Sequence, residues 1–166
     1  MKAVNGVKGW AGRGRQAPGS DRGDLTGTDL KGLDTAMTKL PQHARDLLDG
    51  KNFASIATLL PDGSPQSSIV WIKRDGDDLL FSTIHGRRKT DNMKADPRIS
   101  VLVTDAANGY RYAEIRGRAE LTEDPAADLI EELALKYTGE SFGERPGEQR
   151  VIVRVRPEHV VSYDDD

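Results

Sequence analysis

The sequence predicts a mainly β protein, in which six antiparallel strands form a barrel that carries short helices on its rim. Two observations lead to this prediction. Most apolar segments are short, rich in Val, Ile and aromatic residues, and bounded by turn residues such as Asp75-Gly76. Helical segments stand between only some of these strands, whereas every parallel connection needs a crossover of that size. A doubly wound parallel sheet is therefore excluded.

The beginning of the chain differs in composition from the rest. Residues 1–34 hold 8 of the 17 glycines and almost no aliphatic side chains. Such sequence buries too little apolar surface to offset chain entropy, so residues 1–36 are predicted to be a disordered extension. Residues 37–166 are predicted to form one domain, with Met37 as the expected native start. A functional basic tail is the alternative.

Charge and residue types exclude several classes of function. Residues 1–34 carry six basic and four acidic side chains, which leaves a net charge near −5 on the remainder. That balance argues against nucleic acid as a partner. The absence of cysteine excludes disulfides and a thiol nucleophile. No apolar run has the length of a membrane span or the form of a signal peptide, so a cytoplasmic protein without a membrane partner is expected.

The first half of the domain reads as a helix followed by a three-stranded meander. Pro41 stands in the first turn of the predicted helix, and Gly50 follows its last residue. The predicted elements are a helix over residues 41–49 and strands over residues 53–60, 66–73 and 79–83. Pro61-Asp62-Gly63 forms the first turn between these strands.

The second half alternates helices with longer strands. After a turn at Gly86, a short helix is expected to end before Pro97. Strands follow over residues 98–104 and 110–121, then a helix from Asp124 to Gly139, and a strand over 151–155 that Pro157 breaks and 159–163 continues. Asp124 is the expected N-cap, with Pro125 at the first helical position. Gly117 within its strand indicates a bulge or a close backbone contact.

Three cations stand where a helix begins. Arg87, Arg88 and Lys89 open the short helix, whose free N–H groups and positive dipole end disfavour cations. A bound phosphate would explain them, since it accepts bonds from those N–H groups, from an Arg fork and from a lysine. The alternative is a solvated basic helix start.

The chain offers little acid–base or nucleophilic chemistry of its own. The three histidines are far apart and lack metal-ligand spacing, so no metal site is expected. An enzyme of this kind would use a cofactor, and the anion site predicts that the cofactor carries phosphate. Trp71 would either form a wall of the site beside a planar ligand ring or pack in the core. Lys73 would point to the phosphate or to solvent, and Tyr112 supplies a ring edge.

Two segments resemble a known family. They are IATLLPDGSPQSSIVWIK…LLFSTIHGRRKTDNMKADPRISVLVTD and YRYAEIRGRAEL. They are similar to the flavin- and deazaflavin-binding split barrel of the pyridoxamine 5′-phosphate oxidase superfamily, most of all to its F420-dependent group B oxidoreductases. The resemblance extends over about residues 40–163.

The resemblance implies a split β-barrel and a homodimer with its cofactor sites at the subunit interface. It places the cofactor phosphate among Arg88, Lys89 and Lys73, near the Ser82-Thr83 strand end. The complete cofactor-binding set that we expect is Ser68, Ile69, Val70, Trp71, Lys73, Ser82, Thr83, Arg87, Arg88, Lys89, Asn92 and Tyr112. Ser68 and Tyr112 stand where the FMN oxidase has an arginine and a glutamine. The additional Arg87 suits F420, whose tail is more acidic than that of FMN.

The expected function is an F420-dependent oxidoreductase that transfers a hydride between reduced deazaflavin and an unsaturated or heterocyclic organic substrate. No side chain is assigned as a general acid. The alternatives are an FMN-binding oxidase or reductase, and a barrel that binds a flavin, deazaflavin or haem without turnover.

Overall fold

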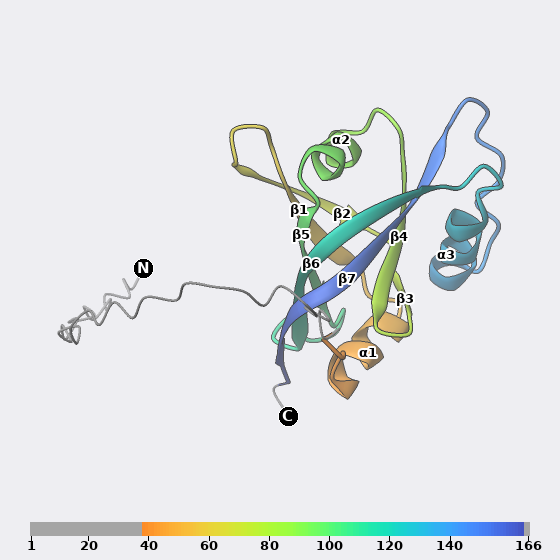
Figure 1. Ribbon diagram of the computed structural model, residues 1–166. Helices are drawn as coiled ribbons and strands as arrows, with labels where there is room; N and C mark the ends of the chain where they lie inside the picture. Colours follow the sequence, from red (N-terminus) through yellow and green to blue (C-terminus); the bar gives the residue numbers. More distant parts are fainter. Residues whose placement is uncertain (1–37, 165–166) are drawn as a thin grey trace, which may run out of the picture. The chain divides into compact units, whose positions relative to one another are not determined.

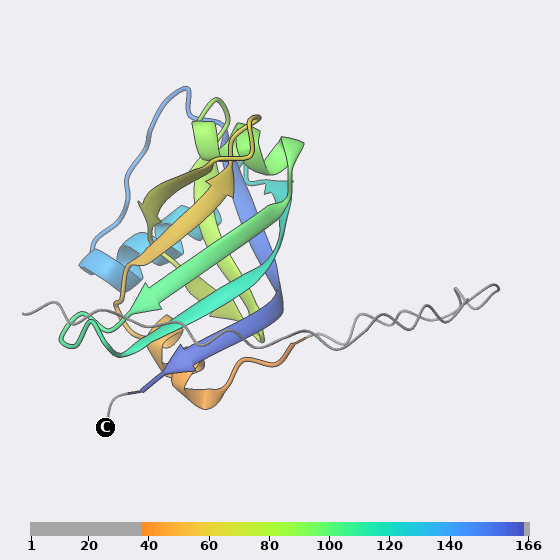
Figure 2. The same cartoon turned by 90° about the vertical axis from the view of Figure 1, so that its left-hand side faces the viewer.

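The computed structural model describes residues 38–164, so the expectations for residues 1–36 and for a start at Met37 lie outside it. One sheet of seven antiparallel strands, in the order β2-β1-β5-β6-β7-β4-β3, curls into an open barrel (Figures 1 and 2). The elements are α1 (Gln42–Asp49), β1 (Ala54–Leu59), β2 (Pro65–Val70), β3 (Lys73–Asp75), β4 (Asp78–Ile84), α2 (Arg88–Ala95), β5 (Arg98–Thr104), β6 (Tyr112–Glu123), α3 (Asp128–Thr138) and β7 (Arg150–Tyr163). The predicted mainly β, antiparallel split barrel is confirmed.

The core follows from the alternation of side chains along each strand. Inward-facing residues such as Ile56, Val101 and Ile115 are fully buried, and Phe81 of β4 lies among them. Helix α1 packs against β3, β5 and β6 and adds Leu47 to the same cluster. Helix α2 packs against β1, and α3 against β4. None of these helices, which are all that the described residues form, is long and apolar enough to cross a membrane.

The prediction of a single strand over residues 66–73 is wrong, because the chain leaves the sheet at Trp71-Ile72 between β2 and β3. Side chains of α3 form hydrogen bonds with the backbone N–H and carbonyl of Ile72, which would otherwise pair with a neighbouring strand. The Ile72 N–H donates to the Tyr137 hydroxyl at 3.2 Å. Its carbonyl accepts from the Lys136 Nζ at 2.9 Å. The sheet therefore has seven strands rather than six.

The predicted irregularity at Gly117 is confirmed. Arg116 pairs with His159, but Gly117 pairs with Pro157, so β7 carries one extra residue at this point. A Cβ on Gly117 would lie 2.0 Å from the Arg156 carbonyl oxygen. The bulge also accommodates Pro157, which has no N–H to donate, and β7 continues through it to Tyr163.

The prediction that Asp124 is the N-cap of α3 is wrong. The helix begins at Asp128, and its N-cap is Ala127 in the left-handed region at φ 59°. Asp124 lies one turn earlier, but its carboxylate accepts the N–H groups of Asp128 at 3.1 Å and Leu129 at 3.2 Å. Asp124 thus satisfies first-turn amides from outside the helix. Gly139 ends the helix at φ 78°, as predicted.

The sheet does not close on itself. Its two end strands are β2 and β3, and the β3–β4 ladder stops at Leu80. Beyond that point, the edge of β4 from Phe81 to Ile84 faces away from β7 without a ladder partner among the described residues. This opening is the split of the barrel, and it determines where the cleft lies.

Candidate functional site

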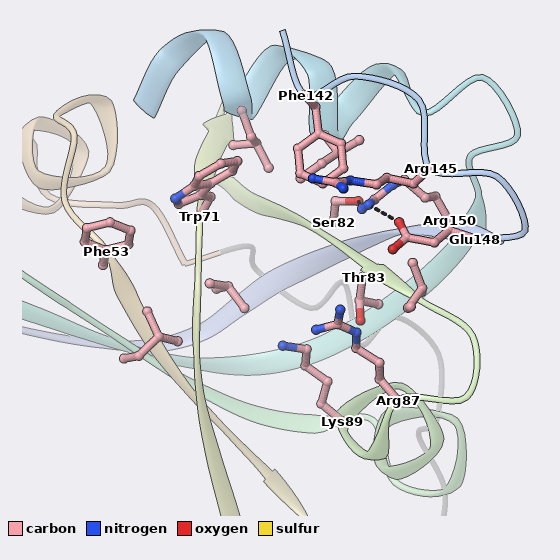
Figure 3. Close-up of a pocket in the computed structure, with 15 residues that line it drawn as sticks. Phe53, Trp71, Ser82, Thr83, Arg87, Lys89, Phe142, Arg145, Glu148 and Arg150 are labelled. Carbon is pink, nitrogen blue, oxygen red and sulfur yellow. Dashed lines mark hydrogen bonds and ion pairs between the residues drawn. The ribbon is translucent and has the colours of Figure 1, made fainter. Parts of the chain in front are cut away.

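A cleft of about 440 Å³ occupies the opening between β2 and the end of β4. The start of α2 lies on one side of it, and α3 with the α3–β7 loop on the other (Figure 3). Its lining residues are Phe53, Ile69, Val70, Trp71, Ser82, Thr83, Ile84, Arg87, Lys89, Ile130, Leu133, Phe142, Arg145, Glu148 and Arg150. The volume is within the range of small-molecule sites.

Aromatic rings form one wall. Trp71 stacks on Tyr137 with ring centroids 5.5 Å apart and planes at 9°. Phe142 presents its ring at 86° to Trp71, 6.4 Å away. The Tyr137 hydroxyl donates to the Asn52 carbonyl at 2.6 Å, which fixes this ring and therefore Trp71. Trp71 is partly buried against the small cluster of Leu80, Leu129 and Leu133, and it also lines the cleft.

Two of the three predicted cations point into the cleft from α2 (Figure 3). Arg87 is the N-cap residue of that helix, and Lys89 is its second residue. Neither forms an ion pair with any residue in the range 38–164. The Lys89 Nζ lies 3.4 Å from the Ser68 Oγ. Burial, and secondarily the charge of Arg87, lower the pKa of Lys89. A bound anion would act against both effects, because a nearby negative charge favours the ammonium form and raises the pKa.

The end of β4 is fastened to α2 by hydroxyl groups. The Thr83 and Thr90 hydroxyls are 3.0 Å apart, and Thr90 donates to the Ile84 carbonyl at 2.8 Å. Ser82, on the opposite face of the strand, accepts a hydrogen bond from Arg150 at 3.4 Å. The strand end is therefore held between the basic helix and the α3–β7 loop.

Sequence reasoning missed the contribution of the α3–β7 loop. Arg150 is 9% exposed, forms an ion pair with Glu148, and places its Cζ 4.5 Å from the Phe142 ring centroid. Arg145 lies 5.3 Å from the same centroid. Arg145 lies in a polar, glycine-rich loop and Arg150 is the first residue of the strand that follows it. The loop shows no periodicity that would indicate a site. The aromatic Phe142 within that loop was the one usable signal.

Five predicted site residues do not line the cleft. Ser68 stays next to it, through its contact with Lys89, and the other four have different surroundings. Lys73 forms an ion pair with Glu132 of α3. Arg88 lines a separate cavity against the β1–β2 turn, because consecutive helix residues point about 100° apart. The buried Asn92 amide donates to the Thr58 hydroxyl at 3.0 Å and so joins α2 to β1. Tyr112 stacks on Tyr163, with ring centroids 5.9 Å apart.

A comparison of the sequence with protein families places this geometry in context. Residues 40–164 match the family model described as pyridoxamine 5′-phosphate oxidase. The chain belongs to the pyridoxamine 5′-phosphate oxidase family. The match extends from the residue before Pro41 to the end of the described region, so it includes every wall of the cleft.

The chain is also similar to solved structures. The chain is similar to an F420 reductase at 34% sequence identity and a TM-score of 0.68, with 74% of this chain and 98% of that chain covered. It is 25% identical to a conserved hypothetical protein from Mycobacterium tuberculosis, with a TM-score of 0.64 and coverage of 78% and 88%. General Stress Protein 26 from Bacillus anthracis, at 18% identity, TM-score 0.58 and coverage of 75% and 94%, shows the fold alone.

Proposed function

We propose that this protein is an F420-dependent oxidoreductase acting on an unsaturated or heterocyclic organic substrate. The observation that carries the proposal is the pair Arg87 and Lys89, which face an aromatic-walled cleft without an acidic partner among the described residues. The similarity to an F420 reductase at 34% identity supports the choice of cofactor.

The residues present fit such a cofactor. Arg87, Lys89 and the free N–H groups of α2 would hold its phosphodiester, and Ser82 and Thr83 would flank it. The strand end from Ser68 to Trp71 would support the ring. When bound, reduced F420 supplies a hydride to the substrate, and solvent supplies the proton. The aromatic wall orients the substrate and excludes water from one side of the cleft.

Titration of the purified protein with F420, FMN and FAD tests the proposal. We expect F420 to bind most tightly and, once reduced, to be reoxidised by electrophilic substrates. Tighter binding of FMN would favour an FMN oxidase or reductase, which the family match also supports. Binding of reduced F420 without reoxidation by a panel of quinones and unsaturated lactones would favour a binding protein instead.

The lowered pKa of Lys89 predicts that anion affinity depends on pH. Without a bound anion, the Lys89 ammonium loses its proton at a lower pH than an ordinary lysine, whose pKa is 10.5. A bound anion raises the pKa of Lys89 again. Binding therefore takes up a proton at high pH, and affinity falls as pH rises through the free pKa. Calorimetric titration with inorganic phosphate between about pH 8 and 10.5 should show this decline. Lys89→Arg should remove it, because arginine stays charged throughout.

A row of side chains on the outer face of the sheet, three of them apolar and exposed, supports a homodimer. Paired residues in adjacent strands share a face, and the register links Ile69, Ser55, Leu102, Glu114 and Val161 across β2, β1, β5, β6 and β7. Ile69 is 63% exposed, Leu102 38% and Val161 42%. The three exposed apolar side chains alternate with the polar Ser55 and Glu114 along this row. Exposed apolar side chains gathered on one face of a sheet are typical of a protein contact surface.

The same row reaches the cleft, since Ile69 also lines it. A second copy seated on this face would therefore cover the mouth of the cleft. Tyr112 lies two residues before Glu114 and so shares the outward face. Its predicted role as a cofactor contact thus depends on such a dimer.

Leu102→Asp is expected to convert the dimer to a monomer, because burying a carboxylate in an apolar interface costs several kcal/mol. Light scattering after size exclusion measures the mass, and circular dichroism checks that the fold persists. Leu135→Asp is the matched control, since Leu135 is 52% exposed on α3 and outside the row. A wild-type monomer, or a Leu102→Asp dimer, would contradict this interface.

A further inference from the structure

We propose that the α3–β7 loop forms a second anion subsite, centred on Arg145, which binds a carboxylate group of the substrate. The inference rests on the proposed function, because it assumes that the cofactor phosphate occupies the α2 side of the cleft. It adds a substrate class, namely planar conjugated acids, and names the residue that would select them.

One of the two arginines that flank Phe142 forms no ion pair among the described residues. Arg145 and Arg150 both place their guanidinium groups against the Phe142 ring, at 5.3 Å and 4.5 Å from its centroid. Glu148 neutralises Arg150, which also donates to Ser82. Arg145 has no ion pair and no side-chain hydrogen bond to any residue that the structure describes. The guanidinium of Arg145 is thus available to an anion, whereas that of Arg150 is already paired with Glu148.

The loop is held in position before any ligand arrives. Glu131 of α3 accepts the Phe142 N–H at 2.9 Å and the Ser141 hydroxyl at 3.1 Å. Phe142 in turn contacts Trp71 edge-on within the aromatic wall. The ring on which Arg145 rests is therefore anchored to a helix and to the aromatic wall, which reduces the entropy lost when a ligand binds.

The position of Arg145 suggests what the anion is. In Figure 3 the basic side chains of α2, Arg87 and Lys89, lie on the opposite side of the cavity from Arg145, and Trp71 lies on the same side as Arg145, next to α3. A planar group that extends from Trp71 toward α2 would thus have cations on both sides of the cavity. With one end taken by the cofactor phosphate, the other is available to the substrate. A guanidinium fork matches a carboxylate in shape and charge, and the Phe142 ring excludes water from one side of it.

The test uses an anthraquinone carboxylate and its methyl ester, which differ in charge but share a planar ring system. Binding is measured by calorimetry with F420-loaded protein and, in a parallel series, with cofactor-free protein. We expect the wild type to bind the acid at least about tenfold more tightly than the ester, as for a charge-assisted hydrogen bond. Arg145→Gln should abolish this preference. The control Arg156→Gln should keep it, because Arg156 pairs with Glu120 on an exposed strand surface.

The carboxylates of the F420 tail are the other source of the same chemistry, and the dissociation constant of F420 separates the two. We expect Arg145→Gln to leave it unchanged within about twofold. A marked weakening of F420 binding in that variant, a wild type without preference for the acid, or a preference that survives Arg145→Gln would each overturn the proposal. Failure of F420 to bind, with an Arg145-dependent preference in cofactor-free protein, would refute the cofactor assignment and leave this subsite standing.

Discussion

Lys89→Ala is expected to weaken F420 binding by about 1.5–3 kcal/mol, which is roughly a ten- to hundredfold rise in Kd. The reason is the loss of a charge-assisted bond from an ammonium group that is half-buried and has no carboxylate partner among the described residues. Fluorescence titration with F420 measures the change. The fold should survive, because the substitution removes a desolvated charge next to Arg87 rather than a stabilising pair.

Two other cations of α2 provide the comparison for Lys89. Lys94→Ala is the matched control, since Lys94 is exposed and contacts His85 outside the cleft. Arg88→Ala should change the Kd by less than about twofold, because Arg88 lines the cavity on the other side of the helix. A larger loss for Arg88→Ala than for Lys89→Ala would show that the phosphate lies on the opposite face of α2 from the one proposed.

Gly117→Ala is expected to reduce the free energy of unfolding by about 3 kcal/mol or more. The new Cβ would meet the Arg156 carbonyl oxygen at 2.0 Å and its carbon at 2.9 Å. Both atoms belong to the backbone of β7 within the bulge, so the clash can be relieved only by separating β6 from β7. Chemical denaturation at a fixed protein concentration measures the change, and the thermal midpoint should fall by on the order of 10 °C.

Gly109→Ala is the control for this substitution. A Cβ at Gly109 meets nothing within 4 Å, and its backbone does not require a positive φ. Its effect should remain within about 0.5 kcal/mol, as for other surface changes. A similar loss in both variants would mean that glycine's backbone freedom, rather than the close approach of Arg156, matters at Gly117.

The elements of this fold could be predicted from the sequence to the extent that their causes are local. The strand over residues 98–104 and the helix that ends before Pro97 match β5 and α2 closely, because turn residues and side-chain alternation act within a few positions. Gly117 was correctly read as an irregularity for the same reason. The break at Trp71-Ile72 could not be foreseen, because its cause is Lys136 and Tyr137, more than sixty residues away.

The candidate site divides in the same way. The sequence by itself determined that cations would open α2, since this is a property of contiguous residues. Only the tertiary structure decided that Lys89 faces the cleft while Arg88 does not, and that Phe142, Arg145 and Arg150 complete it. The physical reason is that the cleft exists where the β3–β4 ladder stops and the sheet stays open. That opening depends on contacts between distant segments, which no local pattern encodes.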